Sequence, residues 1–174
     1  MASSDKTSAL DIDKALDVAS RRMGYERLFP KQREAVEAFI SGRDVFVCLP
    51  TGYGKSFCYG CLPIVFDCLR GQTSSIVVVV TPLVAIMKEQ ALNFEKKGLT
   101  AVYINTGGSV GEGKMQEVLD GRYNLVFISP EQLLTKWLWR EMLHSEPYLN
   151  LVAFVVDEAH CVKKWYVECQ TIYY

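Results

Sequence analysis

Five short apolar runs, rich in β-branched residues, alternate along the chain with longer amphipathic stretches, and this alternation limits the fold more than any other feature. The runs cover residues 45–49, 76–81, 102–104, 125–129 and 152–156. Near-continuous apolar runs are typical of strands that are buried on both faces. Helical candidates lie between the runs, near residues 55–69, 85–97, 110–120 and 132–143. The order predicts an α/β fold, a parallel sheet with helices on both faces.

Two helices are expected ahead of the first run. Leu16, Ala19 and Met23 recur at helical spacing and are followed by Gly24. A second helix is predicted over residues 31–40, because Pro30 precedes it and Gly42 follows it.

The composition fits one folded core. Of the 174 residues, 49% are apolar and 22% are charged. The net charge of −1 gives no overall basic field, so nucleic acid would be held by local contacts. The longest apolar run is far shorter than the roughly 18 residues of a membrane span, and the N-terminus has no apolar signal segment. We therefore expect no membrane partner, and a location in the nucleus of a eukaryote or otherwise in the cytoplasm.

The six cysteines raise the possibility of a metal or redox site. Cys58 and Cys61 have the spacing of metal ligands, but no second pair or nearby histidine completes a zinc site. Buried cysteines of a reducing compartment behave as small apolar residues. Core packing is therefore the better interpretation of this pair.

A phosphate-binding loop is predicted where the first run ends. Residues 49–56 read Leu-Pro-Thr-Gly-Tyr-Gly-Lys-Ser, between a predicted strand and a predicted helix, as the Walker A motif requires. Glycines let consecutive backbone N–H groups point at one phosphate, and the start of a helix adds positive potential. The lysine would reach the β- and γ-phosphates of ATP, and the serine would ligate Mg²⁺. The predicted ATP-binding residues here are Thr51, Gly52, Tyr53, Gly54, Lys55 and Ser56, although Leu49 occupies the first glycine position of the strict motif.

An acidic box follows the fifth run, where Asp157, Glu158, Ala159 and His160 are consecutive. Two adjacent carboxylates at the end of an apolar strand need a positive partner, and Mg²⁺ is the natural one. We expect Asp157 to hold the metal ion and Glu158 to orient or deprotonate the attacking water. His160 would relay the nucleotide state to a neighbouring domain.

The sequence from about residue 24 to 165 resembles superfamily 2 helicases, and within them the RecQ family of DNA helicases. Gly-Tyr at residues 24–25 and Leu-Phe-Pro-Lys-Gln at 28–32 resemble the adenine-recognition motif of that family. The resemblance implies that Gln32 hydrogen-bonds the adenine and that Tyr25 stacks near it. The family usually has Phe-Arg before the proline, whereas this chain has Leu28 and Phe29. The Cys161 that follows the acidic box also matches.

Further matches follow in the order of the family. Thr-Pro-Leu-Val at residues 81–84 with Gln90 resembles its DNA-backbone segment, and Ser-Pro-Glu at 129–131 resembles the motif after its fourth strand. Strand-end hydroxyls and helix N-termini are good donors to phosphates, although proline could simply mark the start of a helix. The resemblance implies a RecA-like ATP-binding domain that acts on single-stranded or partly duplex DNA, with DNA contacts at Thr81, Pro82, Leu83 and Gln90 and coupling through His160 and Trp165.

The resemblance ends after Trp165, where the family continues with Gly-His-Asp-Phe-Arg. We expect a flexible tail over 1–8, N-terminal helices over 9–43, the RecA-like domain over 44–165 and a divergent end over 166–174, with the second RecA-like domain of the family missing. The interpretation is the motor domain of an ATP-dependent 3′–5′ DNA helicase in repair, recombination or replication, with Lys55 and Glu158 catalytic. The alternatives are a truncated, non-catalytic nucleotide-binding module and an RNA helicase of the same superfamily.

Overall fold

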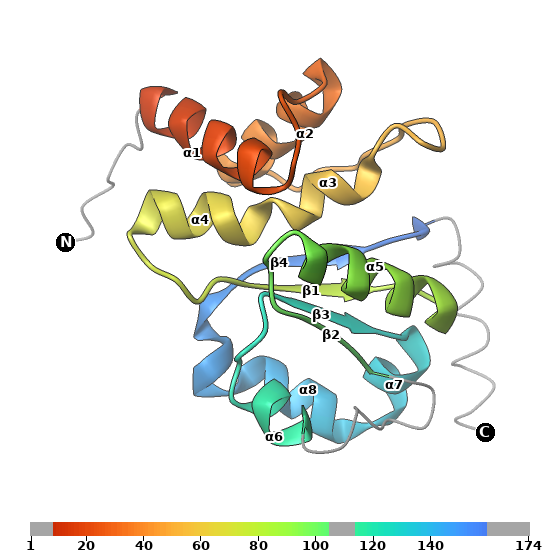
Figure 1. Ribbon diagram of the computed structural model, residues 1–174. Helices are drawn as coiled ribbons and strands as arrows, with labels where there is room; N and C mark the ends of the chain where they lie inside the picture. The colour runs from red at the N-terminus through yellow and green to blue at the C-terminus, as the bar shows by residue number, and fades with distance from the viewer. Residues whose placement is uncertain (1–8, 105–113, 160–174) are drawn as a thin grey trace. The chain divides into compact units, whose positions relative to one another are not determined.

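The computed structural model describes residues 9–104 and 114–159 (Figure 1). The chain forms two compact units, Met1–Ser75 and Ile76–Tyr174. The first contains four described helices and the second contains the sheet. In the part of the chain that the structure describes, no helix is both long and apolar enough to cross a membrane.

Helices form the first unit: α1 (Ala9–Arg22), α2 (Pro30–Ile40), α3 (Lys55–Gly60) and α4 (Leu62–Arg70). α1 packs against α4, and α2 packs against α3. The apolar stripe of α1 is buried, with Leu16 2% and Ala19 0% exposed, and Met23 directly after the helix is buried too. Pro30 is the first residue of α2, where its missing N–H has no intrahelical partner to lose. Both predicted N-terminal helices are therefore confirmed.

The helix predicted over residues 55–69 is divided at Cys61 into α3 and α4. Pro63 lies two residues after the break. It lacks an N–H, and its ring would crowd the carbonyl four residues earlier, so a regular helix cannot continue through it. Cys61 still donates its N–H to Phe57 O at 3.0 Å and accepts from Val65 N at 3.0 Å, so the interruption is a single residue.

The second unit is built on a parallel sheet of four described strands. They are β1 (Ile76–Val80), β2 (Ala101–Ile104), β3 (Leu125–Ile128) and β4 (Leu151–Val156), in the order β2-β3-β1-β4. All three strand pairings are parallel. Every residue of β1 is buried, which agrees with its unbroken apolar sequence. These four predicted strands are confirmed.

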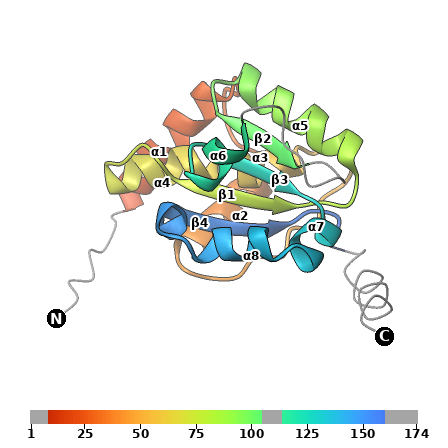
Figure 2. The same ribbon diagram turned by 90° about the horizontal axis from the view of Figure 1, so that it is seen from below.

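Helices cover both faces of this sheet (Figures 1 and 2). α5 (Val84–Lys96) packs on β2 and β3, with the Phe94 and Phe127 rings stacked at 6.2 Å. The opposite face packs against α6 (Lys114–Leu119), α8 (Trp137–His144) and the 3₁₀ helix η1 (Glu146–Asn150). Trp139 is the largest buried side chain of that core. The predicted α/β architecture is confirmed.

The helix predicted over residues 132–143 is two helices, α7 (Pro130–Thr135) and α8. The break falls at Lys136, whose backbone is extended, with φ −101° and ψ 112°. α7 begins earlier than expected because Ser129 caps it: the Ser129 hydroxyl accepts from Gln132 N at 3.3 Å. The second helix then turns Trp139 and Met142 into the core.

The strand predicted over residues 45–49 is wrong for this structure. Residues 43–50 have no regular secondary structure, and the sheet of the described residues has four strands rather than five. Phe46, in the middle of the run, is 81% exposed, whereas Val45, Val47 and Leu49 are half-buried. A β-strand forms only where a neighbouring strand pairs with its backbone N–H and C=O groups. An apolar, β-branched sequence favours a strand but does not provide that neighbour.

Candidate nucleotide-binding loop and acidic strand end

The phosphate loop of the first unit is a tight backbone turn made by its two glycines. Gly52 has φ +83° and Gly54 has φ +79°, a left-handed conformation that side chains with a Cβ rarely adopt. Tyr53 N donates to Pro50 O at 3.2 Å, which closes the turn, and Gly54 caps the N-terminus of α3. Thr51 lies exposed in the turn, and Ser56 is half-buried in the first turn of α3. The loop thus has the curvature that the sequence predicts.

Lys55 folds its ammonium group back onto this loop. Its Nζ atom donates to Leu49 O at 3.0 Å and to Pro50 O at 3.5 Å. Carbonyl groups are weaker partners for an ammonium group than phosphate oxygens are, because a hydrogen bond between two ions is the stronger kind. The lysine is therefore held at the loop by contacts that an anion could replace.

Gln32 ties α2 to the phosphate loop. Its Nε2 atom donates to Tyr53 O at 3.0 Å and to Gly54 O at 3.1 Å, and its Oε1 accepts from Phe29 N at 3.0 Å. The residue is only 2% exposed. Its amide group has two hydrogens and an oxygen with two lone pairs, so the oxygen can still accept one further bond. The structure therefore gives Gln32 a role at the loop itself, and the adenine contact stays a prediction.

Two aromatic contacts flank this loop. Tyr25, expected near adenine, packs edge-to-face on Phe57 with ring centres 5.0 Å apart. Tyr53 packs on Phe29 at 5.0 Å with the rings tilted by 40°. Phe29 is half-exposed and was not among the predicted site residues. Its position directly before Pro30, where the resembled family has arginine, was the signal that could have singled it out.

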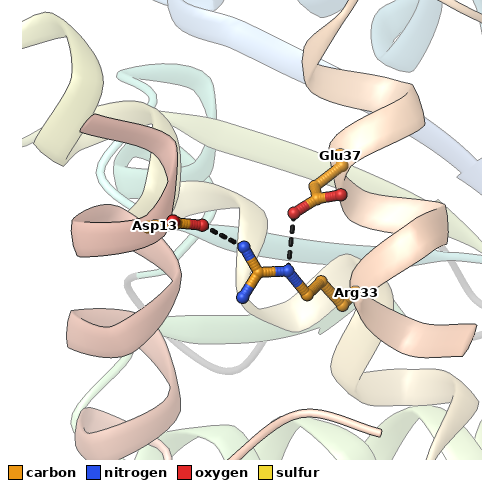
Figure 3. A network of polar contacts seen from close by, with 3 residues as sticks. All are labelled: Asp13, Arg33 and Glu37. Atoms are coloured by element: carbon orange, nitrogen blue, oxygen red, sulfur yellow. Dashed lines mark hydrogen bonds and ion pairs between the residues drawn. The ribbon is translucent and has the colours of Figure 1, made fainter. Parts of the chain in front are cut away.

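An ion network joins α1 to α2, the helix that carries Gln32 (Figure 3). The Arg33 guanidinium lies between Asp13 of α1 and Glu37 of α2, and its Nε is 2.6 Å from Glu37 Oε1. The Asp13 contact, together with Glu37, raises the pKa of Arg33. The side chains are about half exposed, so the network links α2 to α1 but contributes little to stability.

The thiols of Cys58 and Cys61 belong to the packing of α3. Both are buried, and Cys61 Sγ donates to Cys58 O at 3.6 Å. Burial raises the pKa of Cys58 to about 11 and that of Cys61 as well, so both stay protonated at neutral pH. A thiol that holds its proton is a poor metal ligand and nucleophile. Among the described residues, no group of three His, Cys, Asp or Glu side chains could hold a metal ion.

The sheet of the second unit aligns the C-terminal ends of its strands. Ile104 pairs with Ile128, Ile128 with Val80, and Val80 with Val156. The residues that follow these strands therefore share one edge of the sheet, where parallel α/β folds bind ligands. Thr81 N donates to Ile128 O at 3.1 Å, and Asp157 N donates to Val80 O at 2.9 Å.

The acidic box begins at this edge with an unusual backbone. Glu158 has φ +55°, the only left-handed residue other than glycine in the described ranges 9–104 and 114–159. Its N–H donates to Asp157 Oδ1 at 3.0 Å. Glu158 is exposed, whereas Asp157 is half-buried. Left-handed residues other than glycine cost free energy and occur often at functional sites. His160 and Trp165 lie outside the described residues.

The residues predicted to contact DNA differ in accessibility. The Thr81 side chain is buried, 1% exposed, and its hydroxyl has no hydrogen-bond partner within the described part of the chain. Leu83 is 54% exposed, and Pro82 and Gln90 are half-buried. The surface at this strand end is therefore presented by Pro82 and Leu83, and a DNA contact through the Thr81 hydroxyl would first require its exposure.

Three features together are typical of P-loop nucleotide-binding motor domains. They are a parallel α/β sheet, a loop that two glycines turn and onto which a lysine folds back, and carboxylates at the end of a strand. The family model described as DEAD/DEAH box helicase matches residues 29–173. This chain belongs to the DEAD/DEAH box helicase family.

The named proteins that this chain is similar to are helicases as well. The ATP-dependent DNA helicase RecQ of Pasteurella multocida is 32% identical over 172 residues, 94% of this chain and 25% of that protein. The RecQ of Synechocystis is 34% identical over 87% of this chain and 30% of that protein. The helicase SGS1 of Saccharomyces cerevisiae is 36% identical over 78% of this chain and 9% of that protein. The chain spans at most about a third of these relatives.

Solved structures agree on the fold. The helicase MrfA, in a crystal structure with DNA and AMPPNP, aligns with a TM-score of 0.65 at 19% identity, covering 89% of this chain and 22% of that chain. A hypothetical ATP-dependent RNA helicase from Sulfolobus tokodaii aligns with a TM-score of 0.55 at 18% identity, covering 95% and 46%. Both support the RecA-like fold of helicase domains.

Proposed function

We propose that this chain is the ATP-binding motor domain of a RecQ-type DNA helicase that moves 3′ to 5′ on single-stranded or partly duplex DNA. The observation that carries the proposal is the position of Lys55, whose ammonium is held against two loop carbonyls beside glycines in left-handed conformation. Membership in a helicase family supports ATP as the ligand of this loop.

The residues of the loop fit a nucleoside triphosphate. In the proposed complex, Lys55 leaves the carbonyls of Leu49 and Pro50 for phosphate oxygens, which are stronger partners. Backbone N–H groups after Gly54, at the start of α3, bind the same phosphates. Tyr25 and Gln32, which the resemblance places at the adenine, are the residues that we propose for the base. Bound ATP would supply, on cleavage of its terminal phosphate, the free energy that drives movement on DNA.

Hydrolysis is assigned to the acidic box. Glu158 is exposed at the strand end, as a residue that must meet the attacking water has to be. Ser56 and Asp157 are the side chains that we propose as ligands of Mg²⁺, because a hydroxyl and a carboxylate are the oxygen donors that this ion prefers. His160 and Trp165 are proposed to couple the nucleotide state to DNA.

DNA is the proposed partner because the named relatives are DNA helicases. Pro82 and Leu83 present the strand end to solvent, and Gln90 follows them on α5. These three residues are the proposed contacts, with Thr81 once its hydroxyl is exposed. The named relatives are more than three times as long as this chain. Motors of this class close two RecA-like domains around ATP, so we do not expect the 174 residues alone to unwind DNA. We propose the nucleus as the location in a eukaryote and the cytoplasm otherwise.

Phosphate release from the purified chain tests this function. We expect ATP hydrolysis to rise when single-stranded DNA is added and to be lost in Glu158→Gln. Stimulation by RNA and not by DNA would instead assign the chain to an RNA helicase. ATP binding without any phosphate release would assign it as a non-catalytic nucleotide-binding module.

A further inference from the structure

An unassigned cavity lies in the second unit beside the outer edge of β2. Strand β2 is at the end of the four-stranded order, so among the described strands its hydrogen bonds go to β3 alone. The other side of β2 carries backbone N–H and C=O groups that can pair with a further strand. The cavity, of about 240 Å³, is lined on this side by the residues of β2, Ala101, Val102 and Tyr103.

Helix α5 provides the opposite wall. Lys88, Ala91, Leu92 and Glu95 all line the cavity. Their spacing of three, four and seven residues puts them on one stripe of the helix. Ala91 forms the buried floor at 4% exposure, whereas Leu92 is 47% exposed although its side chain is apolar. An exposed leucine beside an apolar hollow and an open strand edge has the layout of a peptide-binding groove.

The size and charge of the cavity indicate which kind of ligand it can bind. Its volume is below the roughly 300–1,000 Å³ of pockets that enclose small-molecule ligands or cofactors. It is suited to one large apolar side chain. Lys88 and Lys114 line the cavity with a single carboxylate, Glu95, so the local charge is positive and favours an acidic neighbour on the ligand.

We propose that the edge of β2 is a docking site for an extended peptide segment of a partner protein. The segment adds a strand to β2 through main-chain hydrogen bonds and inserts one aromatic or large aliphatic side chain between α5 and β2. An aspartate or glutamate near that side chain pairs with Lys88 or Lys114. Nucleic acid is disfavoured as the occupant, because the side chains of Ala91, Leu92, Ala101 and Val102 offer a phosphate backbone no hydrogen-bond donor, whereas the open strand edge suits the main chain of a peptide.

Selection from a displayed library of eight-residue peptides tests the proposal. The full chain serves as bait, and its Leu92→Glu variant is used to remove peptides that bind elsewhere. Leu92 is exposed, so this change leaves the fold intact. Leu134→Glu on α7 is the matched control, since Leu134 is 39% exposed and does not line the cavity. Both variants should bind ATP like the unchanged chain, which separates this test from that of the nucleotide site.

The expected peptides carry an apolar residue next to aspartate or glutamate. Their dissociation constants should rise at least tenfold in Leu92→Glu and in Lys88→Glu, and should stay unchanged in Leu134→Glu. Bound peptide should slow amide hydrogen exchange in Ala101–Ile104. The proposal is overturned if no peptide is enriched over Leu92→Glu, if the enriched peptides protect other amides, or if the β2 edge is already protected in the free chain by its own residues.

Discussion

Gln32 Nε2 lies 3.1 Å from the carbonyl oxygen of Gly54, and a Cβ atom built on Gly54 would lie 2.7 Å from that nitrogen. The glycine at this position therefore serves two purposes. It supplies the left-handed turn of the phosphate loop, and it leaves room for the amide that holds the loop to α2. The identity of one residue thus depends on the side chain of another, 22 positions away.

Replacing Gly54 by alanine should cost more than replacing Gly52. Both glycines have positive φ, and alanine in that conformation costs about 1–2 kcal/mol. Only Gly54→Ala also displaces the Gln32 amide, since a Cβ at Gly52 meets nothing within 4 Å. The lost hydrogen bonds should add about 1–2 kcal/mol. Urea unfolding of both variants measures the difference, and adding Gln32→Ala to each should remove it. Equal losses in the two single variants would show that Gln32 does not restrain the loop.

Replacements of Glu158 should separate backbone strain from catalysis. Because its φ is +55°, we expect Glu158→Gly to be more stable than Glu158→Val by about 1–3 kcal/mol. Neither variant should release phosphate from ATP. Thermal unfolding and a phosphate assay on the same samples test both statements. A valine variant as stable as the glycine variant would mean that the left-handed conformation is absent in solution.

Removing the charge of Arg33 should have a small, salt-dependent effect. Arg33→Met breaks the contacts to Asp13 and Glu37, whose side chains are 53% and 41% exposed, so we expect a loss of about 0.5–1 kcal/mol. The loss should shrink at high salt, where surface ion pairs are screened. Arg122→Met, which breaks the 3.2 Å pair with Asp120, is the control and should cost less. A loss above 2 kcal/mol at high salt would point to packing rather than charge.

Stability should decline in alkali because buried acids keep their protons in the folded chain. Burial raises the pKa of Cys58 from 9.0 to about 11, and burial together with the Glu117 contact raises that of Tyr123 from 10.0 to about 12. Cys58 ionises in the unfolded chain above about pH 9 and Tyr123 above about pH 10, in each case before it ionises in the folded chain, so unfolding becomes easier as pH rises toward 11. Urea midpoints measured between pH 7 and 11 test this. Cys58→Ala should flatten the decline, and a flat profile in the unchanged chain would contradict it.

The sequence was sufficient where local pattern and packing agree. β1 was predictable because five consecutive apolar residues leave no polar face. The phosphate loop was predictable because two glycines precede a lysine at the start of a helix. Residues 45–49 are as uniformly apolar as β1, yet form no strand here, since hydrogen-bond partners are set by tertiary structure. The two hydrogen bonds from Gln32 to the loop were likewise beyond prediction, because they join residues 21 and 22 positions apart.

Titration of Mg²⁺–ATP into the purified chain tests most directly whether Lys55 makes this loop a nucleotide site. Lys55→Ala removes an ammonium that we expect to bond the phosphates, a contact worth about 1.5–3 kcal/mol. Affinity should therefore fall roughly tenfold to one hundred and fifty-fold. Lys136→Ala, which removes an exposed lysine at the break between α7 and α8, should leave affinity unchanged. Equal affinity of Lys55→Ala and the unchanged chain would contradict the assignment.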